Sequence, residues 1–270
     1  MSQKLRDFTV AREWYLRSLV ISEKLGNEGT AETYLNLGAI AQQQRDPAPA
    51  REWYLKSLDT AEKQGNLRVA AGAYHQLGLV AQEQQDPSRA REWYLKSLAI
   101  SEKQSIESYA AITYHQLGII AEDERDFAAA REWYFKSLAI NEEQGNLHSA
   151  AMSYGQLGTI ASKQADFAAA REWYLRCLTI EEKEGNLHDS APTYANLGIV
   201  AGLRGNIEES GHWLTRSIAA FLKTHDQHEA DRGAENFLIT YQRASPADKQ
   251  KLEAIWRDAN LGPFPTEPNE

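Results

Sequence analysis

The chain repeats itself at an interval of 40 residues, and this periodicity limits the folds open to it more than any other feature. The tetrapeptide Arg-Glu-Trp-Tyr recurs with spacings of 39, 40, 40 and 40 residues, beginning at Arg12, Arg51, Arg91, Arg131 and Arg171. A second block, Tyr-x-x-Leu-Gly, begins at Tyr34, Tyr74, Tyr114, Tyr154 and Tyr194. Because the blocks alternate, each unit contains two distinct segments. Self-similarity at this period predicts a stacked repeat architecture.

Both segments of the unit have the periodicity of an α-helix. Around the Arg-Glu-Trp-Tyr block, apolar residues recur at mostly three- and four-residue spacing, as Ala130, Tyr134 and Leu138 do. Residues that make good N-caps precede this segment in every unit, namely Asp7, Asp46, Asp86, Asp126, Asp166 and Asn206. Glycines that can close a helix C-terminus follow it, namely Gly26, Gly65, Gly145 and Gly185. Each unit is therefore predicted to be a helical hairpin.

The glycine of the second block lies in the middle of its predicted helix. This glycine is Gly38, Gly78, Gly118, Gly158 or Gly198 according to the unit. Glycine costs about 1 kcal/mol relative to alanine in a helix interior. Because the cost recurs five times, we expect the partner helix to cross so closely that no Cβ fits.

The regularly spaced tryptophans allow two interpretations. They are Trp14, Trp53, Trp93, Trp133, Trp173 and Trp213. They could form an aromatic recognition stripe, but they flank the buried alanine at helical spacing. Packing between repeats is therefore the favoured interpretation.

The chain resembles the tetratricopeptide repeat (TPR) family, whose first helix carries a Leu-Gly pair and whose second helix carries small and aromatic residues. The pairs here are Leu37-Gly38, Leu77-Gly78, Leu117-Gly118, Leu157-Gly158 and Leu197-Gly198. The resemblance covers roughly residues 1–224, and the 40-residue period is similar to kinesin light chain, Pins-type and bacterial signalling arrays. It implies an all-α fold: a right-handed superhelix, or α-solenoid, of antiparallel helix hairpins with a C-terminal capping helix.

The repeat pattern also predicts the domain organisation. Residues 1–27 correspond to a half-repeat with only the second helix, and five units of about 40 residues occupy 28–224. A capping helix pair is expected at 225–260, since Ser245-Pro246-Ala247-Asp248 can cap a last helix. The Pro-rich segment 261–270 is expected to be a disordered tail.

Composition and motifs argue against several functional classes. A net charge of −9 disfavours nucleic acid or an anionic membrane as the main partner. The lone Cys177 is expected to be a buried filler and fits a reducing, cytoplasmic setting. His225 and His228 have no evident third ligand, so no metal site is predicted. No catalytic motif is found, so we expect neither enzymatic activity nor a cofactor.

One register carries only carboxamides. Two residues before each Leu-Gly glycine, and at the equivalent place in the capping region, stand Asn36, Gln76, Gln116, Gln156, Asn196 and Asn236. The resemblance assigns this register to the concave surface, where similar TPR proteins hold an extended peptide. A carboxamide can both donate to and accept from a peptide backbone. The alternatives are a ladder of Asn and Gln bonded only to itself, or simple duplication of the repeat.

Further residues are expected on the same surface. His75 and His115 precede two of the carboxamides, and Lys163, Arg232 and Arg243 supply positive charge in the C-terminal half. The N-terminal half offers mainly acidic groups, namely Glu32, Glu83, Glu122 and Asp123, with Arg68 as the main exception. A bound peptide is therefore expected to prefer basic residues over the first repeats and acidic residues over the last.

The sequence thus predicts a non-catalytic scaffold that binds an extended protein segment. The alternative is a sensor or regulatory module of a larger signalling protein that controls an NTPase or a protease. The half-repeat at 1–27 is expected to contact another copy or another part of a longer chain, because Phe8 and Val10 lack cover. The sequence does not identify the partner.

Overall fold

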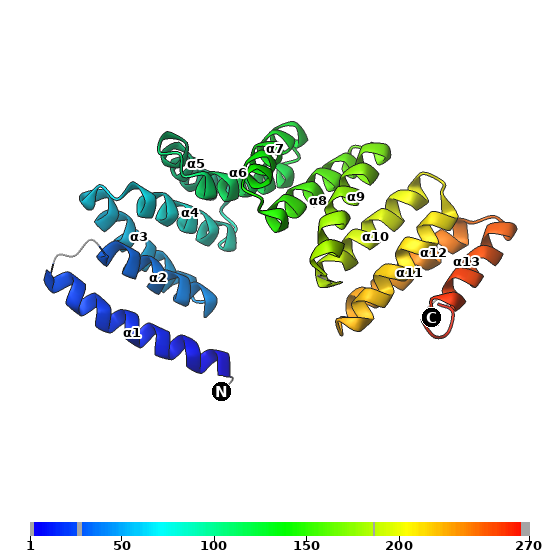
Figure 1. Cartoon of the computed structure of the whole chain (residues 1–270), viewed down its shortest axis with the longest axis horizontal. Coiled ribbons are helices and arrows are strands. Elements are labelled where there is room, and N and C mark those ends of the chain that lie inside the picture. The colour runs from blue at the N-terminus through cyan, green and yellow to red at the C-terminus, as the bar shows by residue number, and fades with distance from the viewer. Residues whose placement is uncertain (1–2, 26–28, 186, 266–270) are drawn as a thin grey trace. The chain divides into compact units, whose positions relative to one another are not determined.

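The structure, a computed structural model, describes residues 3–25, 29–185 and 187–265. All regular secondary structure in these residues is helical (Figure 1). The helices are α1 (Gln3–Leu25), α2 (Thr30–Gln43), α3 (Pro47–Gln64), α4 (Leu67–Glu83), α5 (Pro87–Lys103), α6 (Glu107–Asp123), α7 (Phe127–Glu143), α8 (Leu147–Lys163), α9 (Phe167–Glu184), α10 (Leu187–Leu203), α11 (Ile207–Lys223), α12 (Gln227–Arg243) and α13 (Pro246–Asp258). None of these helices combines the length and apolarity needed to cross a membrane. The predicted all-α repeat fold is confirmed.

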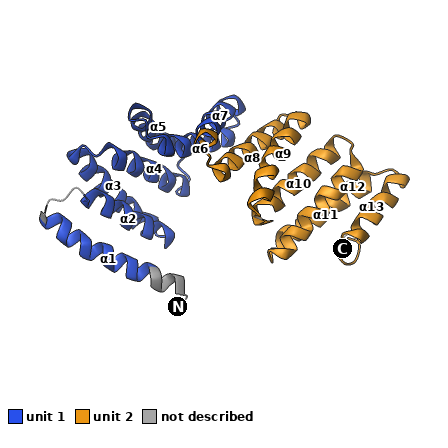
Figure 2. Cartoon of the chain, viewed as in Figure 1, with its two compact units in different colours: residues 1–140 blue, residues 141–270 orange. Residues whose placement is uncertain are grey.

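The chain divides into two compact units (Figure 2). Unit 1 spans residues 1–140 and unit 2 spans residues 141–270. In unit 1, α1 packs on α2, and the hairpins α2/α3 and α4/α5 stack in chain order. In unit 2, the hairpins α8/α9 and α10/α11 are followed by α12, which packs on α11, and by α13, which packs mainly on α11. Each unit buries its own apolar clusters between these layers.

Most of the predicted helix boundaries are correct. The side chains of Asp86 and Asp166 accept hydrogen bonds from the third residue beyond them, as N-caps do. Gly65 and Gly185 both have φ of 68°, the left-handed conformation expected after a helix C-terminus. Asp7 does not begin a helix, because α1 already starts at Gln3. Gly26 lies outside the described residues.

The mid-helix glycines occur where a tyrosine ring of the next helix crosses. A Cβ on Gly118 would lie 2.6 Å from Cε1 of Tyr134, and one on Gly158 would lie 2.7 Å from two ring carbons of Tyr174. Both rings are almost completely buried. The predicted close crossing is therefore confirmed, and the atoms that fill the space belong to the tyrosine of the Arg-Glu-Trp-Tyr block.

The tryptophans pack within hairpins. Five of them pack on the tyrosine that begins the Tyr-x-x-Leu-Gly block, with ring centroids 5.6 to 5.8 Å apart in the pairs Tyr34–Trp53, Tyr74–Trp93, Tyr114–Trp133, Tyr154–Trp173 and Tyr194–Trp213. Four of these pairs are stacked, and the Tyr74–Trp93 pair is tilted. A cation lies over each of these tryptophans, as Lys96 Nζ does at 4.5 Å from the ring centre of Trp93. Five of the six regularly spaced tryptophans thus take part in packing, but these ring contacts lie within a hairpin and not, as predicted, between repeats. Among the described residues, Trp14 has no such contact and is 65% exposed.

The same tyrosines tie each hairpin to the helix before it. The Tyr74 hydroxyl donates to Glu62 Oε1 at 2.7 Å, and the Tyr194 hydroxyl donates to Glu182 Oε1 at 2.6 Å. Burial and the neighbouring carboxylate raise the pKa of Tyr74 to about 12, so the hydroxyl keeps its proton near neutral pH. A tyrosine therefore makes contact in two directions, with a tryptophan of its own hairpin and with a glutamate of the preceding one.

The C-terminal segment corrects the expectation of a disordered tail from residue 261. Ser245 caps α13 as predicted, since its Oγ accepts from the Asp248 amide at 3.2 Å. Beyond α13, the Trp256 indole donates to the carbonyl oxygens of Gly262 and Pro263, and the Phe264 ring packs against Trp256. Residues 261–265 are thus held against the last helices, because an aromatic ring and two carbonyls find partners there. Residues 266–270 lie outside the described part.

Two alanine substitutions within α8 test the close crossing. Gly158→Ala should lower the free energy of unfolding by about 1–2 kcal/mol, because overpacking against Tyr174 outweighs the gain in helix propensity. Gly155→Ala should raise it by about 0.5–1 kcal/mol, since its Cβ would meet only Cys177 Sγ at 3.6 Å. Urea unfolding followed by circular dichroism measures both. A stabilising Gly158→Ala would contradict the crossing.

Candidate functional site

The six carboxamides form one row on each unit. Asn36, Gln76 and Gln116 lie on α2, α4 and α6 of unit 1, while Gln156, Asn196 and Asn236 lie on α8, α10 and α12 of unit 2. In unit 1, α2 contacts α4 and α4 contacts α6; in unit 2, α10 contacts α12. We call these two sets the carboxamide rows. The repeat places one carboxamide on every first helix of a hairpin.

The carboxamides are accessible and carry no hydrogen bond to the protein. Asn36 is exposed and the other five are half-buried. Within the described residues, none of the six side chains donates to or accepts from another protein group. The self-bonded ladder is therefore not formed. Each carboxamide keeps its N–H donors and its carbonyl acceptor for an external group.

His75 and His115 do not lie on the accessible surface, which corrects their assignment to it. His75 is only 4% exposed, its Nδ1 lies 3.1 Å from Thr113 Oγ1 of the next first helix, and its ring packs against Tyr94. His115 is likewise buried and packs against Tyr134. Burial lowers the pKa of His75 to about 4 and also lowers the pKa of His115. These imidazoles fill space between first helices.

An apolar hollow adjoins the carboxamide row of unit 2. It has a volume of about 100 Å³ and lies between α10, the start of α11, and α12. Its lining residues are Ile199, Gly202, Leu203, Ile207, Asn236, Ile239, Thr240 and Arg243. Leu203 is 50% exposed and Ile239 is 44% exposed. The hollow thus combines an apolar floor with a carboxamide and a guanidinium from the predicted set.

Leu203 and Ile239 were not predicted from the sequence to lie on this surface. A signal for Leu203 was present in the repeat. Leu203 occupies the register where other units have Glu83, Asp123, Lys163 and Arg243, so an apolar residue there departs from the pattern. Exposed apolar residues that gather beside polar groups mark contact surfaces more often than scattered ones do.

The charges near the two rows differ in sign. In unit 1, Glu32, Glu83 and Asp123 are exposed, whereas Glu122 is half-buried and accepts from the Tyr134 hydroxyl at 3.0 Å. Gln42, at the end of α2, donates to Glu83 Oε1 at 2.6 Å.

In unit 2, Lys163 and Arg243 are exposed on first helices. Arg232 is also exposed, but its guanidinium lies 2.8 Å from Glu229 Oε2. Its charge is therefore partly neutralised within the protein. Arg243, which also lines the hollow, is a suitable group for an acidic ligand.

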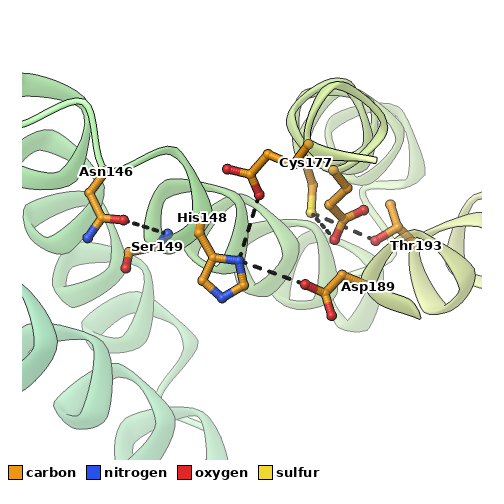
Figure 3. Close-up of polar contacts among 8 residues, drawn as sticks. Asn146, His148, Ser149, Cys177, Asp189 and Thr193 are labelled. Carbon is orange, nitrogen blue, oxygen red and sulfur yellow. Dashed lines mark hydrogen bonds and ion pairs between the residues drawn. The ribbon is translucent and has the colours of Figure 1, made fainter. Parts of the chain in front are cut away.

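Cys177 lies in a buried polar cluster of unit 2 (Figure 3). Its Sγ lies 3.3 Å from Glu181 Oε1, to which it donates, and 3.8 Å from Thr193 Oγ1. Burial raises the pKa of the thiol to about 12, so Cys177 stays neutral and is a poor nucleophile. The buried-filler interpretation of Cys177 is confirmed.

His148 lies at the edge of that cluster and is partnered by acidic groups. Its Nδ1 lies 3.9 Å from Glu184 Oε2 and 3.8 Å from Asp189 Oδ2 (Figure 3). His148 therefore has two acidic partners within unit 2. Among the described residues, no group of three or more His, Cys, Asp and Glu side chains has an arrangement suited to a metal ion.

Comparison with known proteins places these features in a family. A family model described as a tetratricopeptide repeat matches residues 1–63, 69–143 and 149–223. No curated protein matches the chain.

Several solved structures are similar to the chain at low identity. BtubC from P. vanneervenii is 20% identical, with a TM-score of 0.65 over 97% of this chain and 96% of that one. A signal transduction ATPase with a tetratricopeptide repeat sensor from Pyrococcus horikoshii is 16% identical, with a TM-score of 0.72 over 96% of this chain and 40% of that one. A putative kinesin light chain with nearly identical TPR-like repeats from Podospora anserina is 18% identical, with a TM-score of 0.59 over 72% and 95%. At these identities the likeness concerns the fold.

The buried histidines predict an acid-sensitive unit 1. Between about pH 6.5, where an unfolded histidine titrates, and pH 4, the unfolded state binds a proton that folded His75 does not, so stability falls as the pH falls. Going from pH 7 to pH 5 should cost about 2 kcal/mol through His75.

Urea unfolding at the two pH values measures this loss. The substitution His75→Leu should reduce the loss, because leucine has no group that takes up a proton. Leucine is chosen because Leu35 occupies the same register in α2. His228→Gln is the control, since that histidine is exposed. An unchanged pH dependence in His75→Leu would show that His75 titrates normally.

Proposed function

This chain belongs to the tetratricopeptide repeat family, and we propose on that basis that it is a non-catalytic protein-interaction scaffold that binds an extended peptide segment through its carboxamide rows. The observation that carries the proposal is the repeated, accessible and unbonded carboxamide on every first helix from α2 to α12. The six equivalent side chains form no hydrogen bond within the protein. They are therefore suited to a ligand that carries hydrogen-bond donors and acceptors at regular intervals. A peptide backbone is such a ligand.

The dimensions of the repeat agree with this ligand. Packed helices lie about 10 Å apart, and an extended chain advances about 3.3 Å per residue. Neighbouring carboxamides within a row would therefore meet every third residue of an extended peptide, at its backbone N–H and C=O. Recognition of the backbone tolerates many side chains, so specificity would come from the surroundings of each row.

In the proposal, specificity comes from an apolar hollow and from charged side chains beside the rows. The hollow formed by Ile199, Leu203 and Ile239 offers a place for one apolar side chain beside the unit 2 row. Lys163 and Arg243 favour acidic residues on unit 2, while Glu32, Glu83 and Asp123 favour basic residues on unit 1. The exceptions to this pattern are Arg68 and Glu235.

A second candidate function is a sensor or regulatory module that controls an NTPase or a protease. The similar Pyrococcus horikoshii protein is described as a signal transduction ATPase with a tetratricopeptide repeat sensor, and this chain spans 40% of its length. Under this candidate the same rows would bind the signal. Contact of the half-repeat 1–27 with another copy or another part of a longer chain stays a prediction. The proposed setting is the cytoplasm, because the only cysteine is a free, buried thiol.

Removing one carboxamide from each row tests the backbone interaction. Random dodecapeptides selected on the native protein by phage display provide the ligands. Gln116→Ala combined with Gln156→Ala should weaken their binding by about 1–3 kcal/mol, whatever their charge, because hydrogen bonds to the backbone are lost.

Isothermal titration calorimetry measures the change, and Gln44→Ala with Gln250→Ala is the matched control, since both glutamines are exposed outside the rows. Undiminished affinity of every selected peptide for the row variant would refute the proposed mechanism.

Charge reversal on unit 2 tests the proposed preference separately. Lys163→Glu with Arg243→Glu should weaken acidic peptides at least tenfold at low salt and less at high salt, because screening reduces interactions between exposed charges. Basic peptides from the same selection should bind as well as before or more tightly. If acidic peptides lose no affinity at low salt, the charge preference is wrong while the backbone interaction stands.

A further inference from the structure

Helix α1 has the sequence of a hairpin's second helix, but the face that would meet a first helix is uncovered. Trp14 is 65% exposed and Ile21 is 60% exposed, and Ser18 is also exposed. Ala11 is half-buried, whereas its equivalents Ala50, Ala90, Ala130 and Ala170 are fully buried. Helix α2 is the described helix that lies beside α1 (Figure 1). Helix α1 packs on α2 through Leu16 and Leu19, and the half-buried Tyr15 packs against the same cluster. No described helix covers Trp14, Ser18 or Ile21. We call the residues Ala11, Trp14, Tyr15, Ser18 and Ile21 the α1 face.

The hairpin α2/α3 shows what this face binds when it is covered. Helix α3 carries Arg-Glu-Trp-Tyr-Leu-x-Ser, as α1 does. Trp53 of α3 stacks on Tyr34 of α2 with centroids 5.7 Å apart, and Ser57 Oγ donates to the Ala31 carbonyl at 2.8 Å. The ring of Tyr54 lies against α2 where a glycine leaves room for it.

The same three contacts recur in the next hairpin. Trp93 packs on Tyr74 with the rings tilted, the Tyr94 ring lies against Gly78, and Ser97 Oγ donates to the Ala71 carbonyl at 2.8 Å. A tryptophan, a tyrosine and a serine on the second helix therefore meet a tyrosine, a glycine and a backbone carbonyl on the first. The α1 face presents Trp14, Tyr15 and Ser18 in the same order and spacing.

We propose that the α1 face is a docking site for an amphipathic helix that carries the sequence Tyr-x-x-Leu-Gly. The incoming tyrosine stacks on Trp14, its glycine admits the Tyr15 ring, and the backbone carbonyl three residues before its tyrosine accepts from Ser18. Exposed Val10 and Ile21 extend the apolar contact along α1. The site is separate from the carboxamide rows and does not depend on the function proposed for them.

A second copy of the chain does not fit the same face. The glycines of its first helices are already covered, as Gly118 is by the Tyr134 ring and Gly158 by the Tyr174 ring. The α1 helix of a second copy presents Trp, Tyr and Ser. It therefore lacks the tyrosine and glycine that these three side chains contact on a first helix. The geometry therefore favours a helix that is not yet packed against its own hairpin.

The probe is a fluorescein-labelled peptide with the sequence of residues 66–84, which contains Tyr74 and Gly78. Fluorescence anisotropy with the full chain should show saturable binding of one peptide per chain. Gly78→Val in the peptide should weaken binding at least tenfold, because the added atoms would meet the Tyr15 ring. On the protein side, Trp14→Ala should also weaken binding at least tenfold.

Leu95→Ala is the matched protein control, since Leu95 is an exposed apolar residue on α5. This variant should bind the peptide as the native protein does. Circular dichroism checks that Trp14→Ala is folded, and folding is expected because the side chain is mostly exposed.

Three results would overturn the proposal. The first is no saturable binding up to about 1 mM peptide, the weak end of measurable affinity. The second is equal binding by Trp14→Ala, or of the Gly78→Val peptide. The third is a dimer of the protein alone, detected by sedimentation and abolished by Trp14→Ala, because a second copy would then occupy the face.

Discussion

The insertion of a tyrosine ring against a helix that has no side chain at that point is the constraint on which the rest of the fold depends. Close-packed interiors leave no space for one extra methyl group at such a crossing. The tyrosine ring takes the place of the missing Cβ and is almost completely buried. In α11 the tyrosine is replaced by Leu214, whose side chain lies against Gly198 instead. The crossing therefore persists when the aromatic residue changes.

Once two helices are fixed in this way, the rest of the repeat follows. The tryptophan one residue before the crossing tyrosine lies over the tyrosine of the first helix, and that second tyrosine reaches a glutamate of the preceding helix. Contacts thus run from each hairpin to the one before it, which is how repeat proteins obtain stability from neighbouring units. The face of each first helix that carries the carboxamide takes no part in these contacts. Its carboxamide therefore stays accessible.

Much of this could be predicted from the sequence because the repeat reports the same packing several times. The glycine crossing, most helix caps and the burial of Cys177 all follow from local pattern and known helix geometry. The burial of His75 could not be predicted in this way, because its register holds Leu35, Gly155 and Ala195 elsewhere, and its partner Thr113 is 38 residues away. The segment 261–265 was also mispredicted, since its composition is that of a loop while its order depends on Trp256 and Phe264. Interactions that occur once give no periodic signal.

The reactivity of the lone cysteine reports how often the helices around it in unit 2 separate. A thiol reagent reacts with the thiolate, and Cys177 is both buried and held in its neutral form. Chemical labelling of the protein therefore has to wait until α8, α9 and α10 separate around the sulfur. The rate of labelling under native conditions therefore reports how frequently this local opening occurs. No substitution in the chain is needed for the measurement. Because the rest of the sequence contains no other thiol, the rate refers to this one place in the solenoid.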